Sequence, residues 1–120
     1  GANVLVSEDG TMKLGDFGAS KRLSHESVIS GLKGTPHWMA PEIIKGQQTS
    51  QGWKKADVWS LGCTVVEMLT GKMPWPMFPN PIAAMYHIAN GETPPVDRDD
   101  VSQEARDFIH ACCTIDPTQR

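Results

Sequence analysis

The segment Lys54–Thr70 constrains the fold more than any other part of the sequence. Apolar residues recur there at helical spacing along one stripe and also widen it: Val58, Leu61, Val65, Leu69, Trp59, Val66 and Met68. A helix that is apolar over most of its circumference is buried rather than lying on the surface. Gly71 follows as the residue expected to end it. The chain is therefore expected to build a body of helices around this one.

Shorter elements precede and follow the long helix. Two β-prone runs, Val4–Val6 and Thr11–Leu14, are joined by Ser-Glu-Asp-Gly at 7–10, which predicts a β-hairpin. Three more helices are predicted. One begins at Pro41, because proline suits a first turn, and one covers Ile82–Asn90, where apolar residues recur at helical spacing. The last begins after Ser102, which is expected to be its N-cap. Met73–Pro81 has four prolines and is expected to be irregular. This order predicts an α+β fold that is mostly helical.

Composition excludes several classes of protein. The net charge of −3 gives no strong field to hold nucleic acid or an anionic membrane, and no run approaches 18 apolar residues. No membrane span or signal peptide is expected within these residues. The three cysteines Cys63, Cys112 and Cys113 cannot all pair and form no Cys-x-x-Cys unit, and the four histidines lack metal-ligand spacing. We expect reduced thiols and a cytoplasmic location.

Three short motifs occur in a fixed order along the chain. Asp-Phe-Gly stands at 16–18 directly after the second strand, Ala-Pro-Glu at 40–42 follows Gly-Thr-Pro at 34–36, and Asp57 opens Asp-Val-Trp-Ser-Leu-Gly. Each motif alone is a weak match. Ordered at these intervals, with strand, loop and buried helix in the corresponding places, they resemble the protein kinase family over essentially all 120 residues.

The resemblance implies a partial protein kinase domain over residues 1–120. Asn3 matches the asparagine that ends the family's catalytic loop, residues 16–42 match the activation segment, and the later helices match the C-terminal lobe. The catalytic base lies five residues before that asparagine and the loop lysine two residues after the base, so both fall before Gly1. The N-terminal lobe is expected to be absent from this sequence. These 120 residues alone are therefore expected to be inactive.

The resemblance also assigns a nucleotide and metal site for ATP and Mg²⁺. Asp16 matches the carboxylate that holds Mg²⁺, and Asn3 matches the ligand of the second ion. Leu5 matches the floor under the adenine ring. Taken without the resemblance, Asn3 reads as a turn residue and Leu5 as a core strand residue.

Two more residues of the first motif have implied structural roles. Phe17 packs under the N-terminal lobe in active kinases, and Gly18 gives the backbone freedom to change state. Asp57 is implied to bind the catalytic-loop backbone, with a simple helix-dipole partner as the alternative. Trp59 and Trp75 are expected in the core, and Trp38 near the peptide-substrate groove.

Gly-Thr-Pro-His-Trp at 34–38 resembles the serine/threonine kinases. There the hydroxyl of Thr35 supports the catalytic base and loop lysine. Together with Gly-Ala-Asn at 1–3 and the residues around the first motif, it is most similar to the mitogen-activated protein kinase kinase kinase branch. The resemblance implies another protein kinase as the substrate, namely a mitogen-activated protein kinase kinase. His37 replaces the tyrosine commonest in that branch.

A long loop and an ion pair complete the predictions. The stretch 15–33 is rich in serine, glycine and charge, and loops of this length are functional or disordered. Ser27 and Ser30 are the favoured phosphorylation sites within it, with a plain solvated loop as the alternative. Glu42 and Arg120 match a buried ion pair that braces the substrate-binding segment, with fraying expected at Arg120.

Two other functions stay open at this point. A pseudokinase would keep the fold without the chemistry, and the intact Asn3, Asp16 and Thr35 argue against it. The residue five positions before Asn3 decides between the two, because aspartate supports an enzyme. A truncated decoy that binds substrate is also conceivable, although no residue favours it.

Overall fold

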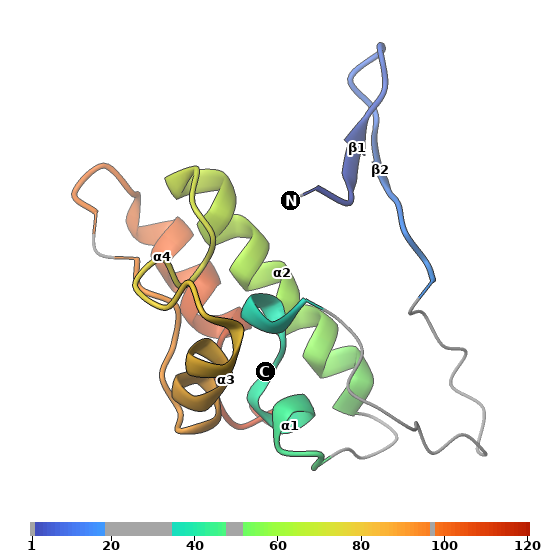
Figure 1. Ribbon diagram of the computed structural model, residues 1–120. Helices are drawn as coiled ribbons and strands as arrows, with labels where there is room; N and C mark the ends of the chain where they lie inside the picture. The colour runs from blue at the N-terminus through green and yellow to red at the C-terminus, as the bar shows by residue number, and fades with distance from the viewer. Residues whose placement is uncertain (1, 19–34, 48–51, 97) are drawn as a thin grey trace.

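The structure, a computed structural model, describes residues 2–18, 35–47, 52–96 and 98–120. Over these ranges a two-stranded hairpin precedes a group of helices (Figure 1). The predicted α+β class, mostly helical with a small hairpin at the start, is confirmed. In chain order the elements are β1 (Val4–Val6), β2 (Met12–Leu14), the 3-10 helix η1 (Pro36–Trp38), α1 (Pro41–Ile44), α2 (Gly52–Thr70), α3 (Pro81–Ala89) and α4 (Gln103–Cys112).

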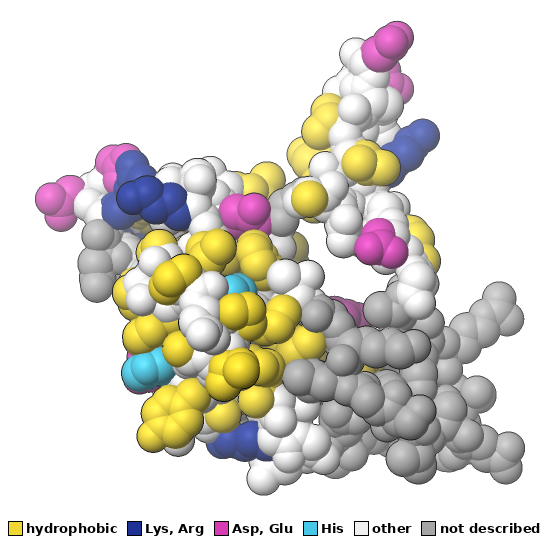
Figure 2. All heavy atoms as spheres, in the orientation of Figure 1, with side chains coloured by type: hydrophobic (Ala, Val, Ile, Leu, Met, Phe, Trp, Pro, Cys, Tyr) yellow, Lys and Arg dark blue, Asp and Glu magenta, His cyan; other side chains and the backbone are white. Residues whose placement is uncertain are grey.

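The strands β1 and β2 form an antiparallel ribbon that stands away from the helices (Figure 1). Val4 pairs with Leu14, and Val6 pairs with Met12. Most of the apolar side chains of the ribbon are exposed (Figure 2). No helix of the described part contacts either strand. The ribbon is therefore held by its own backbone hydrogen bonds and its turn.

The turn uses the residues that predicted it. The Ser7 hydroxyl donates to the Asp9 carboxylate at 2.5 Å, and the Thr11 amide donates to the same oxygen at 3.0 Å. These two hydrogen bonds hold the pKa of the Asp9 carboxyl at about 2, below its ordinary value of 3.8. Gly10 has a φ of 82°, which only glycine adopts without strain.

Helix α2 runs through the helical body and begins two residues before the predicted start. Gly71 ends it with a φ of 66°. The predicted buried stripe is partly wrong, because Leu61, Met68 and Leu69 are 50%, 64% and 38% exposed. The line that is buried instead runs through Ala56, Trp59, Cys63 and Val66.

The packing of α4 selects this buried face. A Cβ atom on Gly62 would lie 2.7 Å from the Cβ of Cys112 and 2.8 Å from the Sγ of Cys113, so the two helices touch where α2 has no side chain. Small residues on α2 therefore face α4.

The hydroxyl of Ser102 accepts from the amide of Ala105 at 3.3 Å, which confirms the predicted N-cap of α4.

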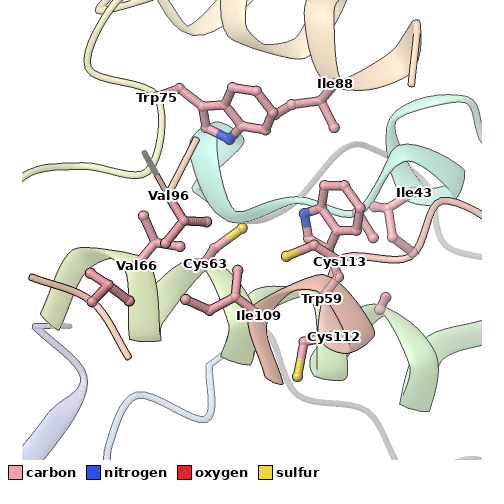
Figure 3. Close-up of a cluster of buried hydrophobic side chains, with 13 residues drawn as sticks. Ile43, Trp59, Cys63, Val66, Trp75, Ile88, Val96, Ile109, Cys112 and Cys113 are labelled. Carbon is pink, nitrogen blue, oxygen red and sulfur yellow. The ribbon is translucent and has the colours of Figure 1, made fainter. Parts of the chain in front are cut away.

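The core lies between α2, α4, α3 and the loop before α3 (Figure 3). Its largest apolar side chains are at most 1% exposed: Trp59, Trp75, Ile88, Ile109 and Val66. The three cysteines are buried and free. A hydrogen bond with the Cys113 thiol and burial raise the pKa of Cys63, so the Cys63 thiol is a poor nucleophile.

Helix α3 begins one residue before the predicted start and follows an irregular proline-rich loop, as expected. The side chain of Asn80 accepts from the amide of Ile82 at 2.8 Å and caps the helix. α3 packs against η1 and α1. In the described part of the chain, no helix is long and apolar enough to cross a membrane.

Candidate active site

Asn3 and Asp16 lie at the same end of the hairpin. The amide of Gly15 donates to the backbone carbonyl of Asn3 at 2.8 Å, which extends the ladder one pair beyond the two strands. Asp16 is the next residue along that strand, and both Asn3 and Asp16 are exposed. The ribbon therefore makes neighbours of two residues that are 13 positions apart in the sequence.

The backbone of Asp16 is unusual. Its φ of 56° is the one positive value among the non-glycine residues that the structure describes. Regular pleating would direct the side chains of Asn3 and Asp16 to opposite faces, because Asn3 stands opposite Gly15. A left-handed residue ends the pleat at a cost of about 1–2 kcal/mol, and such strain is concentrated at functional sites.

Gly18 allows the chain to fold back on Asp16. Its amide donates to the Oδ1 atom of Asp16 at 3.3 Å. A Cβ atom on Gly18 would lie 3.2 Å from the same oxygen, so a larger residue would crowd the carboxylate. The third residue of the Asp-Phe-Gly motif thus shapes the surroundings of the first.

Two apolar residues flank this end of the ribbon. Leu5 is 55% exposed, and its Cδ1 atom would be 3.2 Å from a Cβ on Gly15, so its side chain covers that glycine. Phe17 is 67% exposed. The adenine-floor role of Leu5 and the packing role of Phe17 stay predictions.

The donor atoms at this end suit a hard cation. Asn3 offers an amide oxygen and Asp16 a carboxylate, and Mg²⁺ prefers oxygen ligands. Among the described residues, no group of three or more His, Cys, Asp or Glu side chains could hold a metal. Mg²⁺ commonly keeps several waters and binds through one or two carboxylates plus substrate phosphates. The residues present therefore fit a nucleotide-borne Mg²⁺ and do not form an all-protein metal cage.

Residues 35–44 form the second part of the candidate site. Thr35 precedes η1, is exposed, and its hydroxyl makes no capping hydrogen bond. The backbone carbonyl of Trp38 accepts from the Ser60 hydroxyl at 2.8 Å, which ties η1 to α2. Thr35 is thus presented at the edge of a well-packed segment, and its support of a catalytic base stays a prediction.

His37 has a role that the sequence did not predict. Its side chain is buried, and its Nε2 atom lies 2.9 Å from the carbonyl oxygen of Phe78. The sequence marked His37 only as a departure from the usual tyrosine. No local pattern links two residues that are 41 positions apart.

Glu42 and Arg120 form a buried, bidentate ion pair. The Nη1 and Nη2 atoms of Arg120 lie 2.8 and 3.1 Å from the two carboxylate oxygens of Glu42. The two side chains are 5% exposed at Glu42 and 0% exposed at Arg120. The expected fraying at Arg120 is therefore wrong.

Further contacts hold the Arg120 side chain in its buried position. Its guanidinium also donates to the carbonyl oxygens of Lys55 and Thr114 at 2.7 and 2.9 Å, and it lies 5.2 Å from the centre of the Trp59 ring. The ammonium group of Lys55 in turn donates to the Arg120 carbonyl. The pair thus joins α1, α2 and the residues after α4.

Asp57 is not at the start of its helix. It is the sixth residue of α2, which has no acid in its first turn, so the helix-dipole alternative is wrong. Partial burial raises the pKa of its carboxyl. No hydrogen bond joins the side chain of Asp57 to another residue that the structure describes. Binding to a catalytic-loop backbone stays a prediction.

The remaining predicted site residues, Ser27 and Ser30, lie outside the residues that the structure describes. Their phosphorylation stays a prediction. The assignment of residues 16–42 as an activation segment also stays a prediction.

Comparison with known proteins shows the family. The model of the protein kinase domain matches residues 1–120. The chain is 47% identical to mitogen-activated protein kinase kinase kinase 2 of Arabidopsis thaliana and 46% identical to mitogen-activated protein kinase kinase kinase A of Dictyostelium discoideum, in both cases over its whole length. It is 48% identical to human mitogen-activated protein kinase kinase kinase 3 over 91% of its length.

The chain spans only a small part of each of these relatives. It covers 18%, 12% and 17% of the Arabidopsis, Dictyostelium and human proteins. The match nevertheless includes both parts of the candidate site, namely the hairpin with Asn3 and Asp16 and the segment 35–44 with Glu42. The chain belongs to the protein kinase domain family and is similar to its mitogen-activated protein kinase kinase kinase branch.

Proposed function

We propose that this chain carries the metal-binding and substrate-binding parts of a protein serine/threonine kinase. The enzyme transfers the γ-phosphoryl group of ATP to a serine or threonine hydroxyl of a protein. The observation that carries the proposal is the ribbon end, where Asn3 and Asp16 are neighbours and Asp16 has a left-handed backbone.

The chemistry of these two residues suits phosphoryl transfer. This reaction needs positioning and charge neutralisation more than covalent participation by the protein. When bound, Mg²⁺ would supply neutralisation of the charge on the phosphate oxygens. Asp16 and Asn3 would hold the ion by their oxygen atoms, and Leu5 on β1 would contact the base of the nucleotide.

The substrate is proposed to be a mitogen-activated protein kinase kinase. The names of the relatives support a place in such a cascade. Thr35 supports transfer to serine or threonine, because its exposed hydroxyl is available to a catalytic base and a substrate hydroxyl. We place the enzyme in the cytoplasm, in keeping with its three free thiols.

A transfer assay on the full-length protein tests this proposal. The wild-type protein is incubated with ATP, Mg²⁺ and a mitogen-activated protein kinase kinase, and the phosphorylated residues are identified. Replacement Asp16→Asn removes a metal-binding charge and is expected to lower transfer by about 100- to 1,000-fold. Wild-type transfer should disappear when Mg²⁺ is chelated.

The control is Asp9→Asn, which removes an exposed acid at the opposite end of the same ribbon. It should transfer phosphate at the wild-type rate. A wild-type protein that transfers nothing under any Mg²⁺ concentration contradicts the proposal, as does full activity of Asp16→Asn. Phosphate found only on tyrosine would contradict the serine/threonine assignment.

A further inference from the structure

His37 is a buried histidine inside the segment that the proposed function assigns to substrate binding. It is 5% exposed, and its ring lies edge-on to that of Trp38, with centroids 6.1 Å apart and an interplanar angle of 71°. A side chain this buried has little surface left for a substrate. Its contribution to the site must come through the residues that it touches.

The polar contact of His37 joins two distant segments. Nε2 lies 2.9 Å from the carbonyl oxygen of Phe78, and because a carbonyl only accepts, this nitrogen donates. Phe78 belongs to the loop that leads into α3, and Figure 1 shows η1 beside that helix. Among the described residues, His37 supplies the one hydrogen bond to this carbonyl.

Phe78 is held from its other side by α3. Its ring stacks on that of His87, with centroids 3.8 Å apart and an interplanar angle of 9°. The Nδ1 atom of His87 lies 2.5 Å from a carboxylate oxygen of Glu92, and the ring of Tyr86 meets His87 edge-on. Phe78, whose carbonyl His37 reaches, is therefore held by its ring contact with α3 as well as by the hydrogen bond from η1.

We propose that His37 is a positioning residue that fastens the substrate-binding segment 35–42 to α3 through the Phe78 carbonyl and does not itself read the substrate. This inference rests on the proposed kinase function. The hydrogen bond holds η1 in register with the helix behind it.

This role predicts a specific kinetic signature. Losing the bond leaves a partly buried carbonyl without a donor and loosens the segment, which weakens substrate binding by about 5- to 30-fold. The loss falls on the KM for the protein substrate, with kcat and the KM for ATP unchanged, because a contact equal in ground and transition states is removed. A residue that reads the substrate would instead change which amino acid is preferred after the phosphoacceptor.

The experiment compares two variants of His37 in the full-length protein. His37→Phe keeps a ring of similar size and removes the donor. His37→Gln keeps an N–H the same number of bonds from the backbone. Exposed His110 on α4 provides the control, His110→Phe. Measured quantities are kcat, both KM values, and transfer to peptides that vary in the residue after the phosphoacceptor.

We expect a 5- to 30-fold higher protein KM for His37→Phe, a value near wild type for His37→Gln, and an unchanged peptide preference in both. Wild-type KM in His37→Phe overturns the proposal, as does equal impairment of the two variants or an altered preference. Amide exchange over residues 35–40 gives a readout that needs no turnover, and it should be faster only in His37→Phe. Absence of transfer by the wild-type protein counts against the kinase function instead, and the exchange result still decides the role of His37.

Discussion

The hairpin and the helical body differ in what holds them together. In the hairpin, Leu5, Val6, Met12 and Leu14 are all more than half exposed. In the helical body, the largest apolar side chains are at most 1% exposed and lie in one continuous cluster. A two-stranded ribbon is marginally stable without packing, whereas the helices cover one another.

This difference divides the candidate site between two kinds of structure. The proposed metal ligands Asn3 and Asp16 stand on the ribbon, where local hydrogen bonds alone fix the backbone. The proposed substrate segment stands on the body, where Glu42 and His37 are buried. We expect mutations at the metal-binding end of the ribbon to lower phosphate transfer and leave the stability of the body unchanged, and mutations of the buried ion pair and core of the body to lower its stability.

Breaking the buried ion pair should have the largest effect on the body. Arg120→Met leaves the Glu42 carboxylate buried without its partner and is expected to lower the free energy of unfolding by about 3–5 kcal/mol. Denaturation followed by tryptophan fluorescence measures this, because all four tryptophans lie outside the hairpin. The matched control is Arg98→Met, which breaks an exposed pair with Asp100 and should leave the free energy of unfolding almost unchanged, because solvent screens the pair. Equal losses in the two variants would contradict the assigned role of burial.

A change at the ribbon end should affect activity alone. Asn3→Ala removes a proposed ligand of Mg²⁺ and keeps the backbone carbonyl that binds Gly15. Phosphate transfer by the full-length protein is expected to fall about 100-fold, with an unchanged fluorescence midpoint. Asn90→Ala, an exposed asparagine after α3, serves as the control. A large shift of the midpoint in Asn3→Ala would show that ribbon and body are coupled.

Two glycine-to-alanine substitutions, each of which adds one methyl group, compare the helical body with the hairpin. Gly62→Ala places a methyl group 2.7 Å from the Cβ of Cys112 and should destabilise the body by about 1–3 kcal/mol. Gly10→Ala meets no atom within 4 Å and suffers only from a φ of 82°, at a cost of about 1–2 kcal/mol. The second loss should appear in the amide exchange of β1 and β2 and leave the fluorescence midpoint alone. A shifted fluorescence midpoint in Gly10→Ala, or an unchanged one in Gly62→Ala, would contradict the idea that hairpin and body are stabilised independently.

The smallest expected effect is a pH dependence of the hairpin turn. The folded pKa of Asp9 is about 2, below the ordinary 3.8, because the carboxylate accepts from the Ser7 hydroxyl and the Thr11 amide. Its stabilisation is therefore complete above about pH 4 and is lost as the pH falls toward 2. Proton shifts of the Thr11 amide should follow this titration and should be flat in Asp9→Asn. A midpoint near 3.8 would mean that the turn does not favour the ionised form.

Local signals in the sequence predicted most of the elements. The Ser-Glu-Asp-Gly turn, the N-cap Ser102 and the terminating Gly71 act within a few residues of themselves, so their neighbours suffice to predict them. The register of the ribbon follows from that turn, and with it the proximity of Asn3 and Asp16.

Contacts across the chain were harder to predict. Helix α2 is apolar on most sides, so its periodicity did not identify the face that packs. The close approach of α4 at Gly62 determines which face of α2 is buried, and Leu61 and Met68 lie outside that face and are exposed. The bond from His37 to Phe78 depends on how two loops meet, which no spacing rule encodes. The left-handed backbone of Asp16 was likewise not predicted from its residue type.

The distance along the chain between Glu42 and Arg120 also affects synthesis. The two residues are 78 positions apart, and a ribosome adds roughly 5–20 residues per second. Glu42 is therefore synthesised roughly 4–16 seconds before its partner Arg120. During that interval its carboxylate must stay hydrated, so α1 cannot settle into its final place. The nascent protein closes this part of its fold late, when translation has passed Arg120.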